Sequence, residues 1–115
     1  MQRILLIFSL SLSLLSFSVI AHTAEVKSST QCKNQAIKQA AKLLEFHFGP
    51  DERIEIQPEV KALPSIINPR NKKQRFDVLE VWGYIYKGQY RMRFEYFSQS
   101  DCILMGQEIL EYASL

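Results

Sequence analysis

Aromatic and arginine side chains alternate between residues 74 and 97, and they are the residues of this chain best suited to binding another molecule. This stretch holds the only Trp and four of the five Tyr residues. Trp, Tyr and Arg are enriched at binding hot spots because they bring a large contact area at a small ordering cost. The alternatives are an exposed face that satisfies itself by stacking Arg on the rings, and burial under a helix. The pattern predicts a partner-binding face that consists of Trp82, Tyr84, Tyr86, Arg91 and Arg93.

A basic segment just before this stretch is the second candidate for a partner site. Arg70, Lys72 and Lys73, with Arg75 beside them, could hold an anionic group or an acidic patch on a protein. Basic residues between aromatic ones are also typical of single-stranded nucleic-acid platforms. Without Arg3, however, 13 of the 14 basic residues remain against 12 acidic ones, a net charge of +1. A nearly neutral exported chain argues against nucleic acid, so we expect a solvated loop tip or an acidic protein partner.

Catalytic chemistry has little support in the sequence. Glu80 and Glu95 would lie opposite each other in one hairpin register, where like charges raise one pKa as in hydrolases with paired carboxyls. Arg91 and Arg93 would neutralise both on an open sheet face. His47 is expected at a helix end, where a partial positive charge is favourable. No nucleophile elbow, phosphate loop or zinc-protease motif occurs. We therefore expect no enzyme activity, no cofactor and no metal.

The first 24 residues have the pattern of a signal peptide. Arg3 gives the positive start, a long apolar run diluted by Ser follows, and small residues come next. Cleavage is expected after Ala21 or Ala24. An uncleaved anchor is the alternative, because the run approaches the lower length limit for a membrane span. The sequence thus predicts an exported protein, periplasmic or secreted, with one small domain over residues 25–115.

The two cysteines, Cys32 and Cys102, are predicted to form a structural disulfide. An exported chain folds in an oxidising compartment, and a small domain gains much from a cross-link. The pair closes a loop of 70 residues, which is worth about 4 kcal/mol on the chain-entropy model. A reactive thiol pair would instead favour a C-x-x-C spacing, which is absent here.

A helix is predicted over residues 29–48. Ser28 with Gln31 fits a capping box at its start, and Gly49-Pro50 is a typical helix end. One apolar stripe recurs at steps of three and four residues. Its members are Ile37, Ala40, Ala41, Leu44 and Phe48.

The segment after the helix predicts one short strand over residues 53–57. Pro58, Pro64 and Pro69 should then interrupt regular pairing, which favours an edge strand or an irregular segment. Residues 68–73 are expected to form an exposed loop tip that leads into the hairpin.

The hairpin is predicted to turn at Lys87-Gly88. A two-residue loop would place Leu79 opposite Tyr96 towards the core, and Trp82 opposite Arg93 on the open side. A three-residue loop would bury the Trp and Tyr face instead, because a one-residue change of register exchanges the two faces of a strand.

Residues 102–112 fit a helix or a strand equally well by pattern. We favour a strand that pairs with residues 90–97, with Gly106 at a bulge. The predicted fold class is therefore α+β, an N-terminal helix packed on one antiparallel sheet of about four strands after a signal peptide. This layout resembles cystatin-like and PepSY-like modules, and the resemblance implies a fold and no function.

A small exported domain with an aromatic and arginine face is most typical of a non-catalytic protein-binding module. An inhibitor of an enzyme or an immunity protein would suit this size and disulfide. The alternative is a structural or assembly component of the cell envelope, in the form of a homodimer that pairs edge strands.

Overall fold

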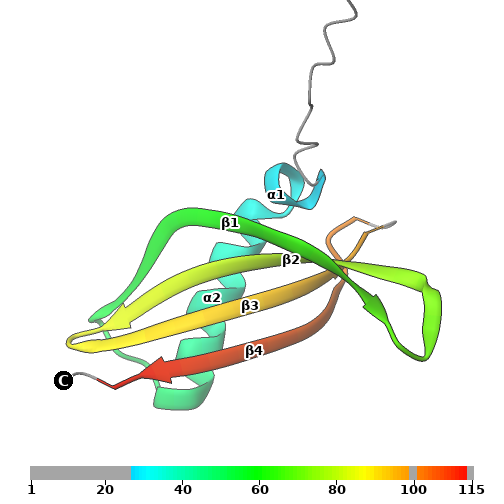
Figure 1. Ribbon diagram of the computed structural model, residues 1–115. Coiled ribbons are helices and arrows are strands. Elements are labelled where there is room, and N and C mark those ends of the chain that lie inside the picture. The colour runs from blue at the N-terminus through cyan, green and yellow to red at the C-terminus, as the bar shows by residue number, and fades with distance from the viewer. Residues whose placement is uncertain (1–26, 99–100, 114–115) are drawn as a thin grey trace, which may run out of the picture.

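The computed structural model describes residues 27–98 and 101–113. The predicted signal peptide lies outside the described residues. Two helices come first and four strands follow (Figure 1), as predicted for an α+β fold. The elements are α1 (Lys27–Gln31), α2 (Lys33–Phe48), β1 (Ile54–Asn68), β2 (Asn71–Ile85), β3 (Gly88–Phe97) and β4 (Leu104–Tyr112).

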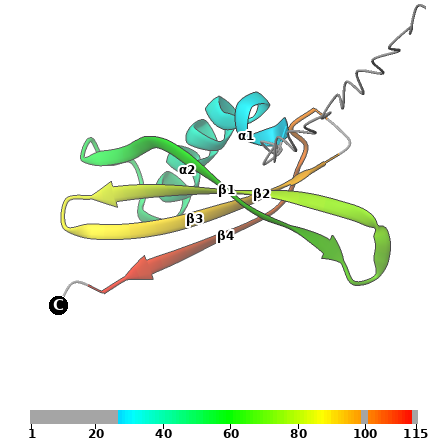
Figure 2. The same cartoon turned by 45° about the horizontal axis from the view of Figure 1, so that its top comes forward.

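The four strands form one antiparallel sheet in the order β1-β2-β3-β4. In Figure 1 helix α2 crosses behind the sheet, and Figure 2 shows both helices on the same side of it. No described element covers the other side of the sheet, which we call the open face. No helix in the described part of the chain is long and apolar enough to cross a membrane.

Helix α2 packs on the sheet through a stripe that differs from the predicted one. Ala40 and Leu44 are fully buried as expected, whereas Ile37 is only half-buried. Phe48 is 45% exposed, although its ring packs on Tyr90 at 4.8 Å between centroids. The buried positions continue from the disulfide-bonded Cys32 at steps of three and four residues. They are Cys32, Ala36, Ala40, Leu43 and Leu44.

The predicted capping box at the helix start is wrong. Ser28 lies inside α1, and its hydroxyl donates a hydrogen bond of 2.6 Å to Oδ2 of the buried Asp77. The helix breaks at Cys32, and α2 has no side-chain cap there. At the other end the prediction is confirmed. Gly49 follows the last helical residue with φ 79°, and its N–H donates to the carbonyl of Glu45.

The disulfide between Cys32 and Cys102 is confirmed, with 5.5 Å between the two Cα atoms. It joins the start of α2 to the segment just before β4. Next to it, the Gln31 side-chain amide donates to Asp101 Oδ1 at 2.8 Å. The cross-link therefore fixes where the helix meets the last strand of the sheet.

Strand β1 is an edge strand, as predicted, but it runs for 15 residues instead of five (Figure 1). Its register with β2 shifts between Ile56 and Val60 and again between Leu63 and Ile66, on either side of Pro58 and of Pro64. Proline has no N–H to donate, so a strand accommodates it at an edge or at a bulge. The prolines thus deform the strand without ending it.

The turn between β1 and β2 is tighter than predicted. Residues 69–70 form the turn, and residues 71–73 already belong to β2. These residues are exposed at the tip of a long hairpin. The first pair that β2 forms with β3 is Phe76 with Phe97, so the tip extends beyond β3.

The hairpin of β2 and β3 turns at Tyr86-Lys87, and the predicted turn at Lys87-Gly88 is wrong. Each β2 residue therefore pairs with a β3 residue two positions earlier than predicted. Leu79 lies opposite Phe94, and Trp82 lies opposite Arg91. A shift of two keeps every side chain on its face, so the faces were predicted correctly and the pairs were not.

Strand β4 confirms the strand prediction for the last segment. Glu95 lies opposite Gly106 and Tyr96 lies opposite Leu104, which leaves Met105 as the extra residue of a bulge. The bulge was expected at Gly106, one position away.

Candidate functional site

Glu80 is the buried centre of the open face. The residue is only 7% exposed. The Trp82 indole Nε1 donates to its Oε1 at 3.1 Å, and Arg93 Nε donates to its Oε2 at 3.0 Å. Charge-assisted hydrogen bonds of this kind are strong when they are partly buried. Glu80 therefore fixes the orientation of two predicted binding residues.

The predicted pair of carboxyls is wrong. Glu80 lies opposite Arg93 in the observed register, and Glu95 lies opposite Val78. Arg93 also approaches Glu108 Oε1 through Nη1 at 3.8 Å. The chemistry at Glu80 is thus that of an ion pair with an arginine.

Tyr112 of β4 completes the cluster around Trp82. The two ring centroids lie 5.2 Å apart. Arg91 Nη1 donates to the Tyr112 hydroxyl at 3.1 Å, and its guanidinium lies 5.9 Å from the ring centroid. Arg91 Nε is buried and has no hydrogen-bond partner in the described part of the chain. Sequence reasoning missed Tyr112, because its place depends on the pairing of β3 with β4.

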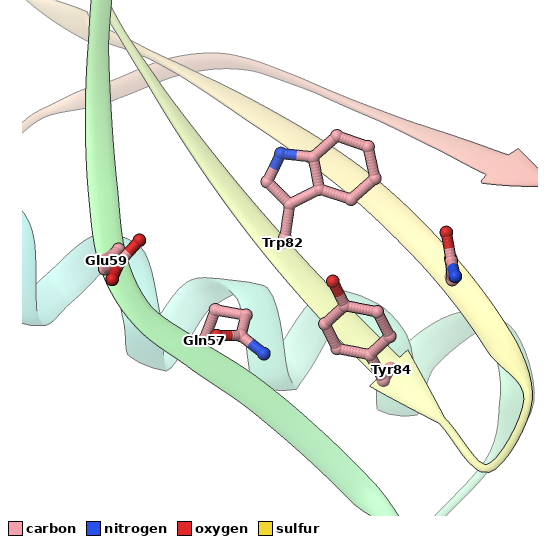
Figure 3. A pocket seen from close by; sticks show the side chains of 5 residues that line it. Gln57, Glu59, Trp82 and Tyr84 are labelled. Atoms are coloured by element: carbon pink, nitrogen blue, oxygen red, sulfur yellow. The ribbon is translucent and has the colours of Figure 1, made fainter.

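A pocket of about 390 Å³ opens beside Trp82 on the open face. Figure 3 shows Trp82 and Tyr84 on β2, with Gln57 and Glu59 across from them on β1. The fifth lining residue is Gln89 of β3.

The pocket lies where β1 changes register. Ile56 pairs with Gly83 and Val60 pairs with Val81, so residues 57–59 of β1 lie opposite Trp82 alone. Pro58 occupies the middle of this bulge, and a bulged strand bends away from its neighbour. Gln57 and Glu59 were not predicted as site residues. The proline was the available signal, but it was interpreted as a break in pairing.

The other predicted site residues do not join this pocket. Tyr86 is 70% exposed in the turn, where its ring lies 5.5 Å from the charged groups of Arg53 and Lys87. The basic residues lie at the tip of the other hairpin. They are Arg70, Lys72 and Lys73. Figure 1 shows the two turns at opposite ends of the sheet, so the predicted residues form three separate groups.

Two other features bear on chemistry. His47 is exposed in the last turn of α2, where the sequence placed it. Within residues 27–98 and 101–113, no group of three or more His, Cys, Asp or Glu residues could hold a metal ion.

No protein-family model, curated protein or solved structure matches the chain. The resemblance of its layout to cystatin-like and PepSY-like modules stays a prediction.

Proposed function

We propose that this chain is an exported, non-catalytic protein-binding module of the inhibitor or immunity type, and that it binds its partner through the open face. One observation carries the proposal. Trp82, Arg91 and Arg93 gather on an uncovered sheet face beside a pocket, and hydrogen bonds already hold them in place. Binding costs less when the contact residues are ordered in the free protein.

Export is part of the same proposal. The confirmed disulfide is compatible with an exported protein, because such bonds persist in oxidising compartments. The first 24 residues have the composition of a signal peptide. The periplasm or the medium would then supply the partner.

A partner with an acidic patch would also contact the basic hairpin tip. Arg70, Lys72 and Lys73 are exposed there and extend beyond β3. Charges at the rim of an interface mainly change the association rate and its salt dependence. A Lys72→Glu/Lys73→Glu variant should therefore associate more slowly, with little change in its dissociation rate.

The test of the open face needs a variant that leaves the Glu80 ion pair intact. Tyr84 lines the pocket, and no hydrogen bond of its side chain is seen in the described residues, so Tyr84→Ala removes contact area alone. Tyr86→Asn is the matched control, because it removes an exposed tyrosine outside the pocket.

The measurement begins with capture of partners from envelope and culture extracts on the oxidised protein, followed by mass spectrometry. The affinity of the purified partner is then measured by calorimetry for the three proteins. We expect Tyr84→Ala to weaken binding about tenfold or more, as at other hot spots, and Tyr86→Asn to change it less than about twofold. Equal affinities for native protein and Tyr84→Ala, with native circular dichroism, would show that the open face is not the site.

The edge strand β4 favours a second function, a structural or assembly component of the envelope that dimerises. Its sequence LMGQEILEY contains neither Pro nor Lys, the residues that usually protect sheet edges. Leu110 and Tyr112 are partly exposed on it. Sedimentation over a wide concentration range tests this function. A dimer that a Leu110→Lys substitution dissociates would support it, and a constant monomer mass would exclude it.

A further inference from the structure

We infer that the pocket beside Trp82 receives a positively charged side chain, Lys or Arg, from the protein partner. The inference rests on the proposed function and names the chemistry of the contact. The pocket walls consist of two aromatic rings, two carboxamides and one carboxylate. Aromatic faces attract cations, and Glu59 is the only charged residue in the lining.

The carboxylate of this pocket forms no ion pair with any described residue. No ion pair or hydrogen bond of the Glu59 side chain occurs among the described residues. Glu55, which lies opposite Tyr84 on the same face, has no ion pair there either. The pocket thus combines an available carboxylate with aromatic walls.

Neither arginine of the open face lines the pocket or forms an ion pair with Glu59. Arg93 is hydrogen-bonded to Glu80 and approaches Glu108. Arg91 donates to the Tyr112 hydroxyl and stacks on its ring. A cation from outside would therefore be attracted by Glu59 without displacing an internal ion pair.

Trp82 is held in place from two sides. Its indole N–H donates to Glu80. The contact with Tyr112 further restrains the ring. The ring face is thus already positioned in the free protein. It can pack against the apolar stem of a Lys or Arg side chain, and its π electrons attract the charged head group.

The experiment uses the indole N–H of the only Trp, which gives one signal in a nitrogen-15 correlation spectrum. The oxidised full-length protein is titrated with acetyl-Gly-Lys-Gly-amide and with acetyl-Gly-Arg-Gly-amide. A norleucine peptide of the same length keeps the apolar stem and lacks the charge. We expect the two cationic peptides to shift the indole signal with millimolar affinity. The norleucine peptide should bind at least roughly fivefold more weakly.

Two variants separate the pocket carboxylate from general surface charge. Glu59→Gln should weaken binding of the lysine peptide roughly fivefold or more. Glu52→Gln, in an exposed turn, should leave that affinity unchanged. Equal binding of the norleucine peptide, or an unchanged affinity in Glu59→Gln, would overturn the inference. A neutral chitotriose that shifts the indole signal when the lysine peptide does not would overturn it in favour of a sugar site.

The partner itself distinguishes this inference from the proposed function. If Tyr84→Ala loses the partner and Glu59→Gln binds it with native affinity, the open face is the site and the cation is not its ligand. If the lysine peptide titrates but Tyr84→Ala keeps the partner fully, the pocket chemistry is correct and the proposed interface is wrong.

Discussion

Asp77 and Glu80 are two buried carboxylates on one strand that point to opposite faces of the sheet. Asp77 accepts hydrogen bonds from Ser28 of α1 and Ser65 of β1. Glu80 accepts from Trp82 and from an arginine on the open face. Two carboxylates three positions apart on β2 thus serve different purposes, one in the packing of the fold and the other in the candidate site.

We predict that Asp77→Ala destabilises the protein by about 1–3 kcal/mol, because it leaves the buried Ser28 hydroxyl without its acceptor. Urea unfolding followed by Trp fluorescence measures the change. Asp101→Ala is the control, since it removes the acceptor of a comparable hydrogen bond at the surface, and it should change stability by less than about 0.5 kcal/mol. Equal effects of the two substitutions would contradict the structural role of Asp77.

Tyr86 adopts a left-handed backbone conformation, with φ 54°. Asn tolerates this region and β-branched residues do not. Tyr86→Val should therefore be less stable than Tyr86→Asn by about 1 kcal/mol or more. Both variants lose the same ring contacts, so the difference in their free energies of unfolding measures the cost of the left-handed backbone conformation. Equal stabilities would mean that the turn relaxes when the tyrosine is replaced.

For single residues, the sequence predicts the face of the sheet on which a side chain lies better than it predicts the cross-strand neighbour of that side chain. The alternation of Trp82, Arg91 and Arg93 correctly placed them on one face. Their neighbours depend on the hairpin register, which a tyrosine at positive φ decides. Glycine is the expected residue in such a turn, so the pattern favoured Gly88 and gave pairs that are two residues out.

At the scale of the elements, the disulfide links the start of α2 to the start of β4. Cys32 begins the buried stripe of the helix, and Cys102 precedes the last strand. A helix of 16 residues is marginal alone and gains its stability from tertiary packing. The cross-link holds it over the sheet at its first turn.

We predict that Cys32→Ala/Cys102→Ala loses about 4 kcal/mol, because the cross-link restricts a loop of 70 residues in the unfolded chain. For a domain of this size, the melting temperature should fall by about 15 °C or more. Calorimetry of the variant beside the oxidised native protein tests this. A loss below about 1 kcal/mol would show that the entropy of the loop is not what the disulfide contributes.

The elements themselves were largely predictable and their irregularities were not. Strong periodicity indicated the helix and the two central strands. Pro58 and Pro64 could equally interrupt a strand or bulge it, and local pattern does not distinguish these outcomes, because the pairing of β1 with β2 decides them. The pocket arises from such a bulge, so two of its lining residues could not be predicted from the sequence.

The molecule as a whole should respond to alkaline pH through its buried tyrosines. Burial raises the pKa of Tyr96, and burial together with the charge of Glu111 raises the pKa of Tyr90. Tyrosines of the unfolded chain ionise at their ordinary pKa of 10.0, so the unfolded state releases protons first. Stability is then fully present below about pH 10 and falls as the pH rises towards the folded-state values.

Urea unfolding at intervals from about pH 8 to pH 11.5 measures this decline. Tyr96→Phe should reduce its slope, since one ionising group is removed from the unfolded chain. Stability that stays constant across this range, or a slope unchanged in Tyr96→Phe, would contradict the coupling.

The two edges of the sheet differ in a way that limits how the molecule can assemble. Prolines disturb the β1 edge, whereas the β4 edge contains none. A strand that pairs with β4, from a partner or from a second copy, would use the edge that has no proline. Pairing of two β4 edges with each other would consume that edge in both copies, which favours a closed pair over a growing chain of copies.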